Sequence, residues 1–446
     1  MSFGSGPSGA PFTSPFRKAV LMRVLFTVLP EKTIFLSMVP LAWALRTAGH
    51  EVRVACQPKF ADAVTQAGLT AVPVGRDSDL FRVARLDPEE LEAARAGLHA
   101  PWDAAEDPAK AAWEPMLNGY YDAVAKGFKP DNFPLISGLV EFARHWKPDL
   151  VVWDPLTQAG AIAAEAVGAA HARLMFGLDV FGAARERFLR LKAERPEGER
   201  TDHLADWLGG YARRFGGEFT ESMATGHFTI DQFPRSLQVE AEGLDYLRMR
   251  FVPYNGKATV PKWLWTAPDR PRVALTMGLT ATDHYDGYTI STQDVLDSLA
   301  DLDVELVATL SEAERAGLRH VPANARLVSF VPLHALAPTC SAVIHHAGTG
   351  TVATMAGHAV PHLSVPYHFD EPLLARKIVE QGSGLALAHD GATGAAVRES
   401  VLRLLEEPRF AARAVDLREE MAALPAPNEL VPRLEELTDR HRTPAR

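Results

Sequence analysis

The sequence lacks the features that mark membrane-spanning, secreted and nucleic-acid-binding proteins. No apolar run approaches the ~18 residues that a membrane-spanning helix needs. Residues 1–21 are rich in Gly, Ser and Pro, and they lack the apolar core of a signal peptide. The net charge of the 446 residues is −10, whereas nucleic acids are bound by clustered Lys and Arg. We therefore expect no nucleic acid partner and no membrane partner.

Cysteine is also scarce, which excludes a disulfide framework. Cys56 and Cys340 are the only two, and neither lies near other residues at a metal-ligand spacing. We interpret both as buried free thiols, which is typical of proteins in a reducing compartment. The sequence therefore predicts a cytoplasmic protein.

Glycine is missing from the loop after the first apolar run. Residues 29–34, Leu-Pro-Glu-Lys-Thr-Ile, contain none. A nicotinamide- or flavin-binding turn needs glycine at this place, because the backbone must approach a pyrophosphate closely. The absence argues against a dehydrogenase.

What the sequence does contain is a repeated alternation of apolar strands and helices. Residues 23–28 predict a central parallel strand, 35–48 a helix that stops at Gly49, and 51–55 a second strand. A further unit comprises a strand at 150–153, a helix at 160–167 and a strand at 170–175, and a second half of the same kind starts with a strand at 272–277. Each half predicts a doubly wound α/β domain with its ligand at the carboxyl ends of the strands.

Between these units the pattern is helical or irregular. Residues 76–147 predict a helical insertion with a helix start at Asp87-Pro88, and residues 179–243 are also helical in pattern. Residues 251–271 are dense in Pro, Gly and Trp and predict an interdomain linker. Residues 1–21 predict a disordered extension.

One segment has the chemistry of a phosphate site. Residues 342–351, Ala-Val-Ile-His-His-Ala-Gly-Thr-Gly-Thr, predict a buried strand, a turn of small residues and a helix start. Unpaired N–H groups and a partial positive charge at a helix N-terminus bind phosphates without a metal. Gly348 and Gly350 would let the backbone come close, Thr349 and Thr351 would add hydroxyls, and His346 would offer an imidazole N–H. A plain tight turn capping a helix is the alternative.

The same segment carries a family resemblance. Residues 345–371, with a histidine pair, two glycines, a Val-Pro turn and Asp370, resemble the donor-binding signature of glycosyltransferases with the GT-B fold. Residues 39–45, 48–54, 67–75, 146–153 and 250–256 resemble the actinomycete family 1 transferases that attach deoxysugars to macrolide and anthracycline antibiotics. The resemblance extends from Met22 to about Thr438.

The resemblance implies two Rossmann-like domains facing each other across a cleft. Residues 22–250 would bind the acceptor, with the helical insertion around it, and residues 272–446 would bind the nucleotide sugar, with a C-terminal helix crossing back. The donor would be a dTDP-deoxysugar, and no cofactor would be needed. The implied donor-binding residues are Thr276, Gly278, Thr280, Val331, His346, Gly348, Thr349, Gly350, Thr351, Asp370 and Glu371.

Several of these positions have structural alternatives. Thr276 fits a simple strand-to-loop turn, and Val331 fits the end of a core strand followed by a Pro turn. Asp370 and Glu371 fit solvated residues that cap the next helix.

The loop after the first strand departs from the family. Aligning it on its flanking residues places Ile34 where most members have a histidine that deprotonates the acceptor hydroxyl, and Ile34 cannot accept a proton. Asp154, which follows the strand at 150–153, is the predicted base instead, and a structural carboxylate is the alternative for it. Glu31 and His171 rank lower, His171 being more typical of a packed strand histidine. An acceptor that reacts through a ring carbon would need little base.

A metal is not required on this interpretation. Asp301 and Asp303 have the Asp-x-Asp spacing of metal-dependent transferases, but they precede a predicted strand away from the phosphate turn. We interpret them as an exposed loop. The helix N-terminus, His346 and the hydroxyls would neutralise the leaving diphosphate.

The sequence therefore predicts an inverting, metal-independent glycosyltransferase. It would move a deoxysugar from a dTDP-sugar to a polyketide acceptor, through an O- or C-glycosidic bond. The alternative is a non-catalytic homologue that binds nucleotide sugars or acts as a helper. The resemblance also allows a homodimer and a cytochrome-P450-like auxiliary protein. Trp207, Tyr211, Phe215 and Phe219, at near-helical spacing, are a candidate surface for that auxiliary, although core packing explains the same spacing.

Overall fold

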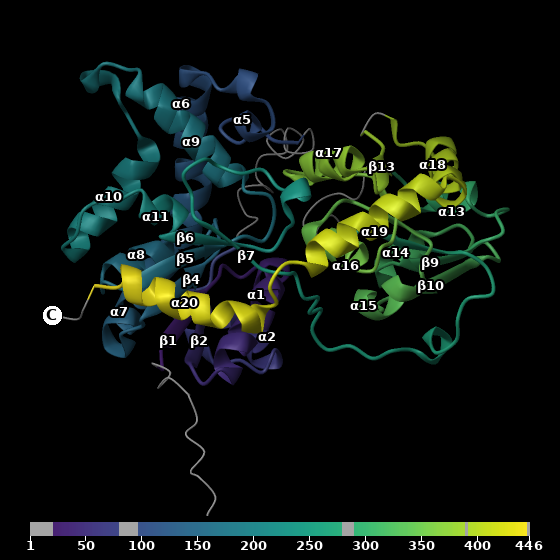
Figure 1. Ribbon diagram of the computed structural model, residues 1–446, viewed down its shortest axis with the longest axis horizontal. Helices are drawn as coiled ribbons and strands as arrows, with labels where there is room; N and C mark the ends of the chain where they lie inside the picture. Colours follow the sequence, from purple (N-terminus) through teal and green to yellow (C-terminus); the bar gives the residue numbers. More distant parts are fainter. Residues whose placement is uncertain (1–20, 80–96, 279–289, 389–390, 444–446) are drawn as a thin grey trace, which may run out of the picture.

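The chain folds into two α/β lobes, as a computed structural model shows (Figure 1). The structure describes residues 21–79, 97–278, 290–388 and 391–443. The expected disordered extension, the helix start at Asp87 and the position of Thr280 lie outside these residues. None of the helices in the described ranges combines the length and apolar character that a membrane crossing requires.

The N-terminal lobe is built on a sheet of seven parallel strands in the order β3-β2-β1-β4-β5-β6-β7. The strands are β1 (Arg23–Thr27), β2 (Glu51–Cys56), β3 (Ala71–Pro73), β4 (Leu150–Trp153), β5 (Ala170–Leu174), β6 (Phe228–Asp231) and β7 (Tyr246–Arg248). β1 lies between β2 and β4, with Thr27 beside Ala55 on one side and Trp153 on the other. The strand order therefore reverses at β1 and β4, which is where such sheets bind ligands.

The C-terminal lobe repeats this arrangement with six parallel strands in the order β10-β9-β8-β11-β12-β13. They are β8 (Arg272–Thr276), β9 (Glu305–Thr309), β10 (Ala325–Val328), β11 (Ala342–His345), β12 (His362–Ser364) and β13 (Gly384–Ala386). Thr276 at the end of β8 lies beside His345 at the end of β11. The two doubly wound lobes of the GT-B fold are thus both present.

Helices cover the faces of each sheet. In the N-terminal lobe they are α1 (Lys32–Thr47), α2 (Ala61–Gln66), α5 (Asp103–Glu106), α6 (Trp113–Asp122), α7 (Lys129–Trp146), α8 (Ala159–Glu165), α9 (Val180–Ala193), α10 (His203–Phe215) and α11 (Ser222–Thr225). The C-terminal half contributes α13 (Thr292–Ser298), α14 (Glu312–Gly317), α15 (Leu333–Leu336), α16 (Thr349–Ala356), α17 (Glu371–Gln381), α18 (Gly394–Glu406), α19 (Pro408–Ala422) and α20 (Pro427–His441).

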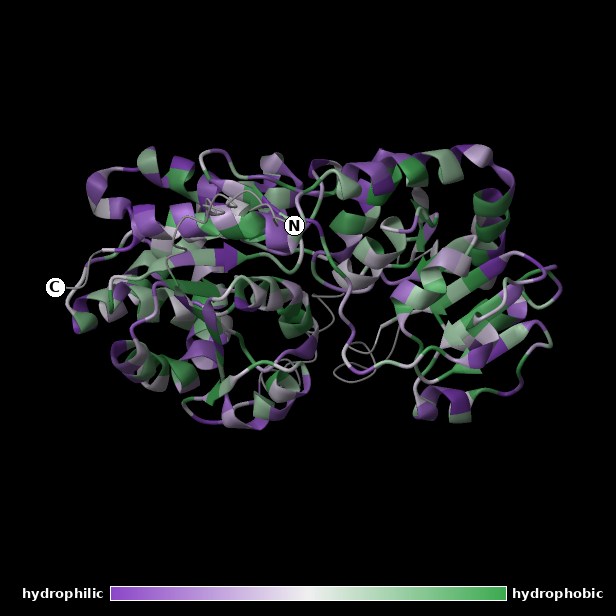
Figure 2. Cartoon of the chain, turned by 60° about the horizontal axis from the view of Figure 1, so that its bottom comes forward, coloured by the Kyte–Doolittle hydropathy of each residue, from purple (hydrophilic) through white to green (hydrophobic). Residues whose placement is uncertain are grey.

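The strands are apolar because both faces of each sheet are covered. Every residue of β4 and β11 is buried, and Figure 2 shows apolar strands inside each lobe with mixed, more polar helices around them. Such continuous apolar runs are typical of parallel sheets between two helical layers. The strands predicted at 23–28 and 150–153 are confirmed as β1 and β4, which lie in the middle of the sheet.

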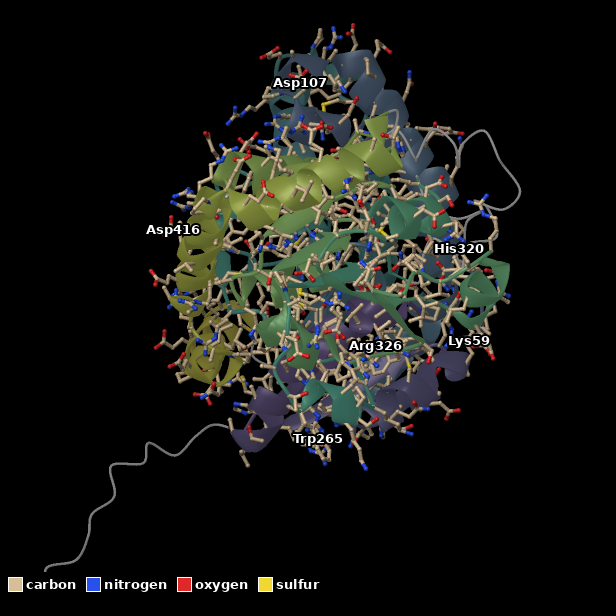
Figure 3. The ribbon with its side chains drawn as sticks, turned by 90° about the vertical axis from the view of Figure 1, so that its right-hand side faces the viewer. Lys59, Asp107, Trp265, His320, Arg326 and Asp416 are labelled. Atoms are coloured by element: carbon tan, nitrogen blue, oxygen red, sulfur yellow. The ribbon has the colours of Figure 1, made fainter. Side chains whose placement is uncertain are left out.

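The last helix crosses from one lobe to the other. Figure 1 shows α19 on the C-terminal lobe and α20 over the N-terminal lobe. Leu430, Val431, Leu434 and Leu437 of α20 belong to the same apolar core as residues of α1 and β1. Residues 251–271 connect the lobes without a strand, and Trp265 in this stretch is 70% exposed at the outer surface (Figure 3).

The helical pattern predicted for residues 179–243 is correct for three helices but misses a strand. This stretch contains α9, α10 and α11, but also the fully buried strand β6, and β7 follows it directly. β6 reads Phe-Thr-Ile-Asp, so unlike the Leu-Val-Val-Trp of β4 it is not a continuous apolar run that would mark a strand beside longer helices.

Candidate functional site

A cavity of about 480 Å³ lies between the lobes. Its C-terminal wall follows β8, β11 and β12 and is formed by Gly278, Leu333, His346, Gly348, Thr349, Gly350, Thr351, His368, Phe369, Asp370 and Glu371. Its opposite wall is formed by Glu31, Thr33, Ile34, Leu36, Ser37, Leu156, Phe176, Gln232, Phe233, Phe251, Tyr254 and Asn255. The loops after β1 and β4 thus face the loops after β8 and β11, as expected for two strand-order reversals that share one ligand.

The N-terminus of α16 opens into this cavity. Thr349, Gly350 and Thr351 form its first turn, and their N–H groups have no acceptor recorded in the described residues. Gly348 is the N-cap and provides no side chain to satisfy them. A helix start without a capping side chain, facing a cavity, has the donors and the partial positive charge to bind an anion. The structure therefore brings together the four turn residues that the sequence predicted.

His346 is wedged between two glycines of this wall. An added Cβ at Gly278 would lie 2.7 Å from its Cε1, and one at Gly348 would lie 2.2 Å from its Nε2. Burial lowers the pKa of His346 to about 4 against the opposing effect of a backbone hydrogen bond with Thr276, so the ring is neutral at neutral pH. A side chain at position 348 would collide with the imidazole, whereas one at position 350 would meet open space. A neutral histidine can still donate one hydrogen bond to a phosphate oxygen.

His345 supports the phosphate turn from below. Its Nδ1 accepts a hydrogen bond from the N–H of Ala347 at 2.8 Å, and its Nε2 lies 2.9 Å from Nδ1 of His362. Since Nδ1 accepts, Nε2 carries the proton and donates to His362. Ala347 has a left-handed φ of +68°, a conformation that costs free energy unless its surroundings hold it. The two buried histidines are therefore part of what holds the turn.

Asp370 does not cap α17, although it occupies the N-cap position. Its carboxylate instead reaches across the cleft and accepts a hydrogen bond from the N–H of Leu178 at 3.1 Å. Burial raises the pKa of Asp370 to about 6. Phe369, with a left-handed φ of +52°, precedes Asp370 in the cavity wall. Asp370 thus lies between the lobes, where it could accept hydrogen bonds from sugar hydroxyls.

Glu371 is held by the backbone of its own turn. One carboxylate oxygen accepts hydrogen bonds from the N–H groups of Tyr367 and His368, at 2.9 and 3.0 Å. Burial raises the pKa of Glu371 to about 8. Its other oxygen lies 3.7 Å from Nε2 of His346, but a protonated acid beside a neutral imidazole is not an ion pair. The solvated-cap alternative does not describe either acidic residue, because both are half-buried in the cavity wall and neither side chain caps α17.

Two predicted donor residues do not line the cavity. Thr276 is buried at the end of β8, next to the imidazole of His346. The side chain of Val331 is buried in an apolar cluster with Leu336 and Val343, while Leu333, two residues later, lines the cavity. The predicted loop at 330–333 thus reaches the cavity through Leu333 and not through Val331.

Asp154 is buried beneath the site rather than exposed in it. Its oxygens accept hydrogen bonds from the N–H of Leu156 and the hydroxyl of Thr157, and Thr157 in turn accepts the N–H of Leu29 at 3.1 Å. The carboxylate therefore ties the loop after β4 to the loop after β1, which matches the structural alternative. Asp154 as the base stays a prediction. Glu31 and Ile34 of the neighbouring loop do line the cavity.

Sequence reasoning missed the contribution of the linker. Phe251, Tyr254 and Asn255 line the cavity, as do Gln232 and Phe233 after β6. Residues 250–256 carried a family resemblance, and this was the available signal that the linker start does more than connect lobes. Gln232 and Phe233 follow β6, which the sequence analysis did not predict, so no local pattern indicated that they line a site.

A histidine cluster lies elsewhere, at the opposite ends of the strands. The nitrogens of His171 and His227 and the carboxylate of Glu165 lie within 4.8 Å of one another. Nδ1 of His171 accepts a hydrogen bond from the indole N–H of Trp153 at 3.3 Å, and Nδ1 of His227 accepts the backbone N–H of His171 at 3.1 Å. A neutral imidazole has one lone pair, so neither histidine has one left for a metal. His171 is the packed strand histidine that the sequence suggested.

The other two surfaces singled out in the sequence are structural. Asp301 is exposed and pairs with Arg398, and Asp303 lies 3.7 Å from Arg270, so the two carboxylates do not converge. On α10, Trp207 is buried and stacks on Phe128, as expected for core packing.

Comparison with known proteins connects this site to one family. Residues 43–278 match the family described as "Erythromycin biosynthesis protein CIII-like, N-terminal domain", and residues 293–437 match the corresponding C-terminal domain. The chain is 45% identical to 10-deoxymethynolide desosaminyltransferase of Streptomyces venezuelae, over 95% of this chain and 99% of that protein. It is 44% identical to aclacinomycin-T 2-deoxy-L-fucose transferase of Streptomyces galilaeus, over 94% and 97%.

Solved structures share the fold over nearly the whole chain. The glycosyltransferase VinC in complex with dTDP matches with a TM-score of 0.84 and 39% identity, covering 94% of this chain and all of that one. The spinosyn forosaminyltransferase SpnP matches with a TM-score of 0.78, at 39% identity over 94% of this chain and 99% of that one. Both lobes and the cavity between them fall within these matches.

Proposed function

This chain belongs to the EryCIII-like glycosyltransferases, and from that premise we propose that it transfers a deoxysugar from a dTDP-sugar to a hydroxyl of a polyketide, with inversion at the anomeric carbon. It is a glycosyltransferase of the GT-B fold. Deoxysugar transferases for macrolides and anthracyclines are its relatives at 41–45% identity. No observation favours the non-catalytic alternative.

The observation that carries the proposal is the uncapped start of α16. Three N–H groups with no acceptor among the described residues face the cavity beside the neutral, half-buried ring of His346. This set would hold the diphosphate of dTDP and stabilise its growing charge as the sugar leaves. The structure of VinC, a relative at 39% identity, is a complex with dTDP.

The rest of the cavity fits the other two components of the reaction. Asp370 and Glu371 would bind the hydroxyls of the sugar, because carboxyl oxygens accept hydrogen bonds that orient a ring. The facing wall carries Phe176, Phe233, Phe251 and Tyr254, whose aromatic surface suits an apolar polyketide. The acceptor hydroxyl would attack the anomeric carbon as the bond to the diphosphate breaks. The acceptor loses its proton, and dTDP leaves with the bonding electrons.

The two cysteines bear on the cellular compartment. Free thiols at Cys56 and Cys340 suit a cytoplasmic enzyme. An auxiliary protein and a homodimer stay predictions. Trp207, one of the four residues named for the auxiliary surface, is used in the core.

A turnover assay tests the proposal. The protein is incubated with dTDP-deoxysugars, with the macrolactone 10-deoxymethynolide or the anthracyclinone aklavinone as acceptor, with and without an auxiliary protein. Released dTDP and a glycosylated product are expected. Binding of dTDP without product under all these conditions would favour the helper alternative, and no binding at all would reject the proposed function.

The phosphate turn has its own test by calorimetry with dTDP. His346→Ala should weaken dTDP binding by about 10- to 100-fold, as expected for a lost hydrogen bond to a charged group. His358→Ala, an exposed histidine just beyond α16, is the matched control and should bind dTDP normally. Equal affinity of the two variants would remove His346 from the site.

A further inference from the structure

We propose that Glu31 is the general base of the reaction, a role that rests on the proposed function of the cavity. The donor groups occupy the C-terminal wall, so the acceptor must lose its proton toward the opposite wall. Among the described residues, Glu31 is the only carboxylate or imidazole side chain that the N-terminal lobe and linker contribute to the cavity. The other groups there are apolar, amide, hydroxyl or phenol side chains, none of which is a base at neutral pH.

The carboxylate of Glu31 is held in one place with one oxygen free. It is the N-cap of α1, and its Oε1 accepts hydrogen bonds from the N–H and the hydroxyl of Thr33, at 3.0 and 2.8 Å. No described residue donates a hydrogen bond to its Oε2. The unpaired N–H groups at the start of a helix attract a negatively charged group. A base needs this combination of an anchored side chain, a negative charge and an unoccupied lone pair.

Neighbouring residues explain why the role falls to this position. Ile34, three residues later, lines the same wall but has no proton acceptor. Asp154 has both oxygens occupied and, through Thr157, holds the backbone of Leu29. The N–H of Glu31 in turn bonds to the carbonyl of Leu29 at 2.6 Å. Asp154 is thus a positioning residue for the loop that presents Glu31.

The proton balance of the step is complete without a further reactant. Oε2 of Glu31 takes the proton of the acceptor hydroxyl while that oxygen forms its bond to the anomeric carbon. The bond from the anomeric carbon to the diphosphate breaks, and dTDP carries away the electron pair. Glu31 then returns its proton to water through the open cavity.

Glu31→Gln and Glu31→Ala test the assignment in the full chain, with the dTDP-sugar and acceptor that the unmodified protein turns over. Both variants should lose kcat by about 100-fold or more, as general-base removal does, while dTDP affinity stays within about twofold. Added formate should raise the rate of Glu31→Ala, because a small carboxylate can enter the vacated space, and should leave Glu31→Gln unchanged. A structural role would not produce this rescue.

The results that overturn the proposal are distinct from those that reject the function. If the unmodified protein turns over and Glu31→Gln keeps at least half of its kcat, Glu31 is not the base. Joint loss of kcat and dTDP affinity without formate rescue also overturns it, because the residue is then structural. Asp154→Asn is the comparison, with a smaller loss of kcat expected and no response to formate. An unmodified protein that neither binds dTDP nor forms product rejects the proposed function instead.

Discussion

The imidazole of His346 restricts which residues can stand beside it. A Cβ added at Gly278 or at Gly348 would lie less than 3 Å from both Cε1 and Nε2 of the ring, so a methyl group at either position would collide with it. Gly350 belongs to the same turn but meets nothing within 4 Å. The two glycines of the motif therefore have different reasons to be glycine, which their spacing in the sequence could not distinguish.

Gly348→Ala and Gly350→Ala should differ in stability for this reason. The first places a Cβ 2.2 Å from Nε2 of His346 and should destabilise the protein by about 1–3 kcal/mol, as overpacking does. The second adds a good helix former in the first turn of α16 and should cause no loss. Denaturant unfolding without ligand measures both. Equal stability of the two variants would contradict the close packing of His346.

Glu371 should make stability depend on pH with a sign opposite to that of the buried histidines. Its pKa rises from 4.5 to about 8 on burial, so within that window the folded state holds a proton that the unfolded state has lost. The stability it contributes is therefore present below 4.5 and is lost as pH rises through about 8. The pKa of His346 is lowered from 6.5 to about 4, so the stability that this residue contributes to the fold is lost as pH falls through that range.

Thermal unfolding of Glu371→Gln at a series of pH values measures the contribution of Glu371 ionisation to stability. The amide cannot ionise, so the variant should gain stability relative to the unmodified protein as pH rises from 4.5 to about 8. Arg418→Gln, which alters an exposed pair with Glu419, is a control that should run parallel to the unmodified protein. A pH-independent difference for Glu371→Gln would show that Glu371 ionises normally.

At the scale of helices and strands, continuous apolar segments were predictable and short mixed ones were not. The expected strand at 150–153 coincides with β4, and the helix at 35–48 overlaps α1, because both carry clear apolar patterns. β6 and β7, Phe-Thr-Ile-Asp and Tyr-Leu-Arg, mix polar and apolar residues over four and three residues, so no apolar run marks them. The phosphate turn was predictable because its chemistry is local. Tyr254 and Gln232 reach the cavity through tertiary packing, for which a single sequence carries no signal.

Helix α20 comes after the C-terminal lobe in the chain, but it should stabilise the N-terminal lobe. Leu434 is fully buried in the core shared with α1, so Leu434→Ala should cost about 2–5 kcal/mol. Glu436→Ala, on the exposed side of the same helix, should stay within about 0.5 kcal/mol. Hydrogen exchange should place the loss of protection caused by Leu434→Ala in α1 and β1. Loss confined to α18 and α19 would instead place α20 energetically with the C-terminal lobe.

At the scale of the whole molecule, the cavity exists only while the lobes stay together. Contacts that cross between them flank it: Asp370 reaches Leu178, Arg376 pairs with Glu106, and Glu420 accepts two hydrogen bonds from Ser236. The proposed donor contacts lie on one lobe and the proposed base on the other. Catalysis should therefore depend on lobe contacts that touch neither substrate.

Glu420→Ala tests that dependence. Glu420 of α19 accepts the N–H of Ser236 at 3.1 Å and its hydroxyl at 2.5 Å, so the variant removes both bonds at once. We expect a larger radius of gyration without ligand in small-angle scattering and a severalfold higher KM for the acceptor. Affinity for dTDP should not change, because the groups proposed to hold the diphosphate all belong to the C-terminal lobe. Glu419→Ala, exposed on the same helix, should match the unmodified protein. Identical KM and scattering for the two variants would mean that the lobes are held together without this contact, and that the cavity wall bearing Glu31 keeps its place by other means.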